Sequence, residues 1–135
     1  MLNNAFQAID LQKKALDASW LRQDILSNNI ANVNTPGYKR QDVEFENLLE
    51  DYLSGKRFSI NATHPGHITD GFSGLDSVRP RVITEENTSL RIDGNNVNVD
   101  TEMAELAKNS IKYNAVVTDV NSQLRRLKSA ISGGR

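Results

Sequence analysis

Of all the residues in this chain, two histidines and one aspartate come closest to the types and spacing of a reactive site. His64 and His67 flank Pro65-Gly66, and Asp70 follows three positions later. Imidazole nitrogens and a carboxylate can bind Zn²⁺, but a closed zinc site needs four ligands, and the chain has no Cys. We therefore interpret His64 and His67 as ordinary loop histidines, with an unfamiliar enzyme site around these three residues as an alternative.

The neighbouring carboxylates Glu85 and Glu86 have the residue types of a general acid and base. Adjacent residues on an extended strand point to opposite faces, so these two are poorly placed to act on one substrate. No glycine-rich phosphate loop follows an expected strand, and no Ser or Thr stands in a nucleophile-elbow sequence. The sequence therefore predicts neither an enzyme nor a cofactor, and we interpret Glu85 and Glu86 as solubilising charge.

The charge balance gives no reason to expect nucleic acid or a membrane as partner. The chain has 16 Lys and Arg against 17 Asp and Glu, and its local basic clusters, such as Arg125-Arg126, lack interleaved aromatic residues. The first residues show no basic segment followed by an apolar run, and charges interrupt every later apolar stretch. We expect no Sec-type signal peptide and no membrane insertion, so any export must depend on another signal.

A long helix is expected at the amino-terminal end, because residues 3–33 contain no Pro or Gly and their apolar residues recur at helical spacing. The apolar residues form two rows on neighbouring faces. We expect one partner to leave the second row uncovered. The first row is Phe6, Ile9, Leu16, Trp20 and Ile30, and the second is Leu11, Ala15, Ala18 and Ile25.

A more regular row predicts a second long helix at the carboxy-terminal end. Its apolar residues alternate at steps of three and four, as in a coiled coil. Asp100 is a natural N-cap, and Gly133 and Gly134 follow the last apolar residue. Two helices of this kind, each about 45 Å long, can pair along their whole length. The row is Met103, Leu106, Ser110, Tyr113, Val117, Val120, Leu124, Leu127 and Ile131.

The middle of the chain has a different composition and contains all three Pro and most of the Gly. We expect a short helix that ends at Gly55, and extended segments over residues 81–84 and 90–99 with a hairpin turn at Asp93-Gly94. The predicted fold is mainly α, with the terminal helices paired as an antiparallel, coiled-coil-like hairpin and a short helix, loops and a small β-hairpin between them. The expected regions are residues 1–33, 34–99 and 100–135.

An Asn-rich run precedes a turn at the end of the first helix. Asn is a weak helix former, so residues 27–34 sacrifice helix propensity. The run either frays ahead of Pro36 or uses its amides to bind neighbouring backbone groups, which would close the helix, fix the turn or set the register against partners. The sequence alone leaves these interpretations open.

This run and turn resemble the signature of bacterial flagellar rod, hook and hook-associated axial proteins. The segment from Asn96 to Met103, followed by Leu106 to Asn109, similarly resembles the start of that family's last helix. Only residues 34–99 lie between the terminal helices, which matches the short proximal-rod type, and the undisturbed turn differs from the longer segment typical of the short relative FlgC. The motif residues are Asn28, Asn29, Ala31, Asn32, Thr35, Pro36, Gly37 and Tyr38.

The resemblance implies a structural subunit of the proximal rod that assembles with itself and its relatives through the apolar rows of its terminal helices, forming a torque-transmitting drive shaft. Implied partners are FlgC, FlgF and FlgG, the rod-base adaptor FliE, the MS ring, the rod-cap protein and the type III export apparatus. The implied location is the periplasmic rod of the basal body, after signal-less export. A soluble coiled-coil adaptor or flagellar export chaperone is the alternative, but it leaves the Asn-rich turn unexplained.

Overall fold

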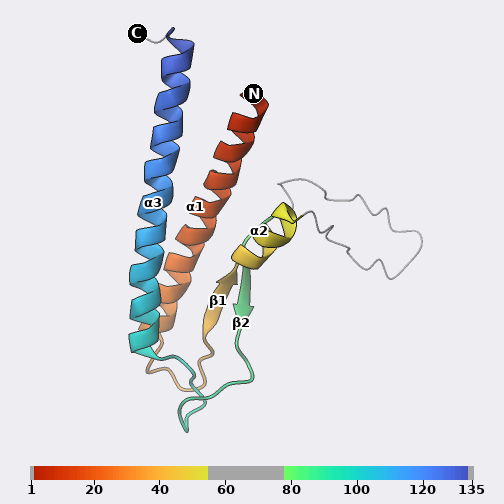
Figure 1. Ribbon diagram of the computed structural model, residues 1–135. Helices are drawn as coiled ribbons and strands as arrows, with labels where there is room; N and C mark the ends of the chain where they lie inside the picture. The colour runs from red at the N-terminus through yellow and green to blue at the C-terminus, as the bar shows by residue number, and fades with distance from the viewer. Residues whose placement is uncertain (1, 55–77, 134–135) are drawn as a thin grey trace, which may run out of the picture.

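Three helices and two strands follow one another in the part of the chain that the structure describes, and Figure 1 shows their arrangement. The computed structural model describes residues 2–54 and 78–133, without the side chains of residues 2–7 and 52. Helices α1 and α3 pack together and run in opposite directions, and both chain termini lie at the same end of the molecule, where the two helices diverge and α3 extends beyond the start of α1 (Figure 1). The predicted mainly α fold with an antiparallel pair of terminal helices is confirmed. The elements are α1 (Leu2–Ala31), β1 (Gln41–Glu44), α2 (Glu46–Leu53), β2 (Arg81–Thr84) and α3 (Val99–Ile131).

The Asn-rich run closes the carboxyl end of α1. Asn32 Nδ2 donates to the carbonyl oxygen of Asn28 at 2.8 Å, and the backbone N–H of Asn32 donates to the same oxygen at 3.1 Å. The hydroxyl of Thr35 then donates to Asn32 Oδ1 at 3.2 Å. Because these bonds satisfy groups that the end of a helix leaves unpaired, the structure supports closure by amides over fraying.

Helix α3 is capped two residues earlier than we expected. Asn98 Oδ1 accepts hydrogen bonds from the backbone N–H groups of Asp100 at 3.0 Å and Thr101 at 3.5 Å. Asp100 as N-cap was therefore wrong, since Asp100 already lies in the first turn, where a negative charge complements the helix dipole. At the other end Gly133 adopts a φ of 71°, a conformation that favours glycine.

Three polar contacts fix the register of α1 against α3. From the first of these contacts to the last, both helices advance by 17 residues (29 to 12 and 102 to 119), so the two helices keep one antiparallel alignment over this stretch. The last turns of α3 therefore lie beside the first turns of α1. The contacts join Asn29 with Glu102, Ser19 with Asn109, and Gln12 with Asp119.

The small sheet joins segments that are far apart in the sequence. β1 pairs antiparallel with β2, with Gln41 opposite Thr84 and Glu44 opposite Arg81. The expected strand over residues 81–84 is confirmed, but the hairpin over residues 90–99 is wrong. There the N–H groups of residues 90 and 91 both donate to the carbonyl oxygen of residue 95, which makes tight turns instead of a strand ladder.

The hydrophobic core lies between α1 and the middle region. Ala18 and Ile25 of α1 are buried against Val43, Phe45 and Val78. We expected the second row of the first helix to stay uncovered. For Ala18 and Ile25 this was wrong, because the middle region packs over them. Burial of a side chain such as Ile or Phe stabilises by about 1.5–3 kcal/mol, so this contact attaches the middle region firmly to α1.

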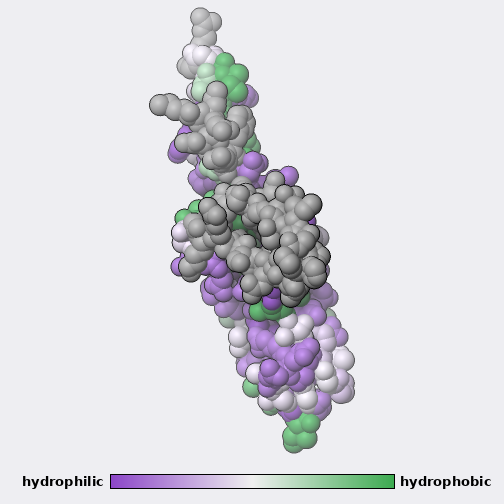
Figure 2. Space-filling view, turned by 90° about the vertical axis from the view of Figure 1, so that its right-hand side faces the viewer, coloured by the Kyte–Doolittle hydropathy of each residue, from purple (hydrophilic) through white to green (hydrophobic). Residues whose placement is uncertain are grey.

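The molecule's end away from the chain termini is largely hydrophilic on the face that Figure 2 shows. Its interior is polar as well, since Asn29, Asn95, Asn96 and Glu102 are all buried. Among the described residues, no helix is long and apolar enough to cross a membrane. The described chain therefore combines an apolar core midway along α1 with a polar core where the two helices join the middle region.

Candidate assembly site

Asn29 is fully buried, and its side chain uses its whole hydrogen-bonding capacity. Its Nδ2 donates to the carbonyl oxygen of Gln41 at 2.7 Å and to Glu102 Oε2 at 2.8 Å. Its Oδ1 accepts from the hydroxyl of Tyr38 and from the backbone N–H of Gln41, both at 3.1 Å. One side chain thus joins α1, the turn, β1 and α3. Each buried polar group left unpaired costs about 1–3 kcal/mol, so the position strongly favours Asn.

Glu102 is the buried carboxylate of this network, and Arg40 is its cation. Arg40 Nε donates to Glu102 Oε1 at 2.6 Å, and its Nη1 lies 3.1 Å from Asp42 Oδ2 and 2.6 Å from Glu85 Oε1. Burial lowers the pKa of Arg40, but the hydrogen bond and negative charge of Glu102 outweigh this and raise it. The guanidinium stays charged and holds the residue after the turn against the first turn of α3.

Sequence reasoning named Asn29 and Tyr38 but missed Arg40 and Glu102 as members of the network. Our interpretation of Glu85 as merely solubilising was also wrong, because its carboxylate binds Arg40. Glu102 and Asn109 are seven residues apart, and both are buried on the face of α3 that meets α1. Seven-residue spacing puts two residues on one face of a helix but does not show whether that face is buried, so the sequence carried no clear signal for Glu102.

Two further buried amides hold the segment before α3 against the turn. Asn95 Nδ2 donates to three backbone carbonyl oxygens between residues 32 and 35, at 2.9–3.1 Å. Asn96 Oδ1 accepts from the backbone N–H of Arg40 at 2.6 Å. Gly37, with a φ of 72°, donates its N–H to the carbonyl oxygen of Asp93 at 2.9 Å. The turn after α1 and the turn before α3 therefore form one hydrogen-bonded unit.

The predicted motif residues divide into an inner and an outer group. Asn29, Asn32 and Tyr38 belong to the hydrogen-bonded network. The members of the outer group are exposed to solvent, and their contribution within the chain is to shape the turn. Their role in assembly stays a prediction. The outer residues are Asn28, Ala31, Thr35, Pro36 and Gly37.

The predicted apolar seam is only partly covered when α1 pairs with α3. Partly buried are Ile9, Leu16, Leu106, Val117, Val120 and Leu127. Exposed are Trp20, Met103, Tyr113, Leu124 and Ile131. The side chain of Phe6 lies outside the described residues. Large apolar side chains left in water mark interaction surfaces, so the exposed members are the ones available to neighbouring molecules.

A shallow groove of about 320 Å³ lies between α1 and α3, beside Trp20 and Tyr113. Asn109 also lines this groove, and its Nδ2 donates to the carbonyl oxygen of Ser19 at 2.8 Å and to Gln23 Oε1 at 3.1 Å. Its Oδ1 is buried without a donor in the described part of the chain. The groove is thus lined by two aromatic side chains and by an amide whose buried oxygen accepts no hydrogen bond from the described residues. We call it the Trp20–Tyr113 groove.

An ion pair anchors α2 to the helical pair. Arg22 Nη1 and Nη2 each lie 2.5 Å from a carboxylate oxygen of Glu46, and Lys112 Nζ lies 3.4 Å from the same carboxylate. The hydrogen bond from Arg22 lowers the pKa of Glu46 to about 2, against the opposing effect of burial. The same hydrogen bond raises the pKa of Arg22. This contact links α1, α2 and α3 in one charged cluster.

His64, His67 and Asp70, considered above as a metal or enzyme site, lie outside the described residues. Within residues 2–54 and 78–133, no group of three or more His, Asp or Glu side chains is arranged to hold a metal ion. The described geometry is instead that of a packed helical pair, with a polar network at one end and exposed apolar side chains along one side.

Comparison with known proteins gives one consistent result. The profile of the family "Flagella basal body rod protein" matches residues 9–39. The flagellar basal body rod protein FlgB of Bacillus subtilis is 39% identical over 123 residues, which cover 91% of this chain and 92% of that protein. FlgB of Salmonella typhimurium is 32% identical over 141 residues, covering 99% of each, and FlgB of Buchnera aphidicola from Acyrthosiphon pisum is 33% identical over 136 residues, covering 98% and 100%.

These relatives confirm the resemblance inferred from the Asn-rich turn. They are structural rod proteins, so the prediction that the chain is not an enzyme is confirmed as well. They also agree with a basal-body location and with association with other basal-body components. The chain belongs to the FlgB family of flagellar basal body rod proteins and is a structural component of that rod.

Proposed function

We propose that the chain is a subunit of the proximal rod that assembles with copies of itself and with other rod proteins through α1 and α3. The observation that carries this proposal is the row of large apolar side chains left in water on the two terminal helices, where Trp20 is 68% exposed and Ile131 is 84% exposed. A contact between two different surfaces of one chain repeats without closing, and so builds a helical assembly. One such row per subunit is enough to extend a rod.

The same packing suits a part that transmits torque. Close-packed side chains leave little compressible space, so paired helices that also pack against neighbouring pairs resist twisting. The network around Asn29 and Glu102 adds a rigid joint at one end of the pair. In this proposal the helices carry the load, and the network keeps their alignment fixed while they do so.

The proposal extends to partners and location. It includes FlgC, FlgF and FlgG, the adaptor FliE, the MS ring and the rod-cap protein as neighbours, and the type III export apparatus as the route to the periplasmic part of the rod. Support comes from the family, whose members are basal body rod proteins. Family membership favours a rod subunit over the soluble adaptor or export chaperone considered from the sequence.

The substitution Trp20→Asp tests the assembly role. We expect cells that carry it to be non-motile and their purified basal bodies to lack this subunit, since a charge would stand where a neighbour must pack. Because the Trp20 side chain is largely in water, circular dichroism of the purified variant should match that of the wild type. Asn47→Asp, at an exposed position of α2, is the matched control and should swim normally. Normal swimming and normal incorporation of Trp20→Asp would contradict the proposal.

A further inference from the structure

Two carboxylates stand beside Trp20 on the surface of α1, next to the residues that line the Trp20–Tyr113 groove but not among them. Asp17 lies three residues before Trp20 and Asp24 four residues after it, so all three are on one side of the helix. Both aspartates are exposed, and neither forms an ion pair within the described part of the chain. The groove is therefore an apolar, aromatic site with two exposed carboxylates on the outer side of Trp20.

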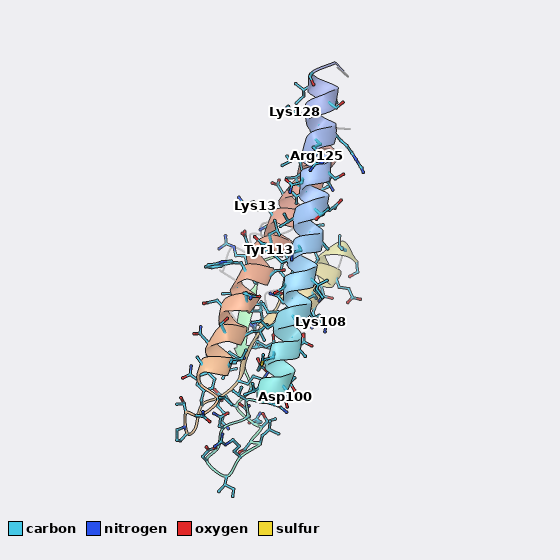
Figure 3. All side chains as sticks on the ribbon, turned by 90° about the vertical axis from the view of Figure 1, so that its left-hand side faces the viewer. Lys13, Asp100, Lys108, Tyr113, Arg125 and Lys128 are labelled. Atoms are coloured by element: carbon cyan, nitrogen blue, oxygen red, sulfur yellow. The ribbon has the colours of Figure 1, made fainter. Side chains whose placement is uncertain are left out.

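The last turns of α3 present the complementary chemistry. Leu124 is 48% exposed and Ile131 is 84% exposed, and their seven-residue spacing puts them on one face. Lys128 lies between them on that face and Arg125 lies next to it, both exposed and without an ion pair in the described residues. Figure 3 shows Tyr113 midway along α3, and Arg125 and Lys128 near its carboxyl end. This end of α3, residues 121–131, is called the α3 tip below.

We propose that the α3 tip of one copy seats in the Trp20–Tyr113 groove of a second copy. In this arrangement Leu124 and Ile131 pack against the two aromatic side chains, while the basic side chains of the tip meet Asp17 and Asp24. The inference rests on the proposed assembly function and specifies which surfaces of two copies meet. Asp17 and Asp24 are seven residues apart, about 10.5 Å along α1, whereas Arg125 and Lys128 are three residues apart, about 4.5 Å along α3, so the two surfaces are complementary in charge and not in register.

The α3 tip cannot reach the groove of its own chain. The register of the helical pair puts the tip beside the first turns of α1, several turns away from Trp20. The occupant must come from another molecule, and a second copy supplies both the apolar spacing and the opposite charge.

A charge exchange tests this contact in cells that lack the native gene. One variant carries Asp17→Lys with Asp24→Lys, a second carries Arg125→Asp with Lys128→Asp, and a third combines all four changes in one chain. We expect each pair of reversals to lower the amount of subunit in purified basal bodies by about tenfold or more, because like charges then face each other across the contact. The combined variant should regain motility and most of its incorporation, because each copy again offers opposite charges to the next.

Arg126→Asp is the matched control, since Arg126 is exposed in the same turn of α3 but lies on the opposite face from Lys128. It should incorporate like the wild type. Two neutral double variants repeat the comparison with less disturbance of the helix. They are Asp17→Asn with Asp24→Asn, and Arg125→Gln with Lys128→Gln. Each should show a smaller loss of incorporation than the matching charge reversal.

The outcomes separate this inference from the function on which it rests. Normal incorporation of both reversal pairs would overturn the tip-in-groove contact while leaving the rod assignment, tested by Trp20→Asp, intact. Loss in both pairs without recovery in the combined variant would also overturn it, since the groove would then receive a different partner. Absence of even the wild-type chain from basal bodies would remove the proposed function and this contact together.

Discussion

Asn29 of α1 and Glu102 of α3 are joined by a hydrogen bond of 2.8 Å between two fully buried side chains. The bond links the Asn-rich motif at the end of the first helix to the first turn of the last one. It explains why an amide is needed at that place, because only an amide can donate to Glu102 and to a carbonyl oxygen while accepting from Tyr38 and a backbone N–H.

Asn29→Asp should destabilise the chain strongly, although the two side chains have nearly the same shape. The new carboxylate loses the donor group and stands against the carboxylate of Glu102, which we expect to cost about 3 kcal/mol or more at pH 7. Urea unfolding of the variant and the wild type at pH 7 measures this difference.

Asn28→Asp provides the comparison for that experiment. Asn28 is the neighbouring residue but its side chain is exposed, so its substitution should change the free energy of unfolding by less than about 0.5 kcal/mol. Equal effects of the two substitutions would show that the network around Asn29 does not hold the fold.

Glu102→Ala should cost about 3–5 kcal/mol, because it removes the fully buried one of the three carboxylates that bind Arg40 and also takes an acceptor from Asn29 Nδ2. The double substitution Arg40→Met with Glu102→Met should cost less than Glu102→Ala alone, since it removes both charges together. Chemical denaturation of the wild type, Glu102→Ala and the double variant gives the free energy of unfolding of each. A double variant that is less stable than Glu102→Ala would contradict this account of the pair.

Glu46 should make the chain sensitive to acid. The hydrogen bond from Arg22 lowers the pKa of Glu46 from 4.5 to about 2, so the unfolded chain binds the proton first as the pH falls. The stability from this contact is complete above the unfolded value and is lost as the pH falls from 4.5 toward about 2. Glu46→Gln should flatten this part of the stability profile, whereas Glu50→Gln, on the exposed side of α2, should leave it unchanged.

Val117→Asp and Leu124→Asp should both prevent assembly, but for different reasons. Val117 is partly buried beside α1, so a charge there should destabilise the single chain by about 1–3 kcal/mol. Leu124 is 48% exposed, so Leu124→Asp should leave the unfolding midpoint nearly unchanged and still abolish motility. Unfolding curves and swimming assays together distinguish the two. Normal swimming of either variant would count against the predicted seam.

The long helices could be predicted because their signals are local. A stretch free of Pro and Gly with apolar residues at helical spacing has few alternatives to a helix, and both terminal helices formed where expected. The N-cap was misplaced because both Asn98 and Asp100 are good capping residues, and only the backbone geometry decides between them. The local sequence pattern therefore predicted the two terminal helices, with an error of one or two residues at their ends.

The sheet and the polar network could not be predicted in the same way. Residues 41–44 carry too short a pattern to indicate a strand, and they become one only by pairing with residues 81–84. The expected hairpin failed because Asp93-Gly94 allows a tight turn but does not require strands around it. Arg40 and Glu102 are both charged residues that a sequence places at the surface by default, and only the tertiary fold brings them together.

The motif around the turn was recognised from its sequence, but its physical purpose was not. Asn29 is distinguished from Asn28 by one helical step, which places one amide inside and the other in water. A single sequence does not show which of the two amides is buried, because that depends on where α3 packs. The apolar row posed the same difficulty, because periodicity groups Trp20 with Leu16 although one is exposed and the other is partly covered.

The hydrogen-bonded network around Asn29 joins residues from both halves of the chain, since Asn29 and Glu102 are 73 positions apart in the sequence. In the proposed type III export of the unfolded chain, this bond can form only when both residues have left the channel. The network that aligns α1 with α3 is then completed only after most of the chain has been exported.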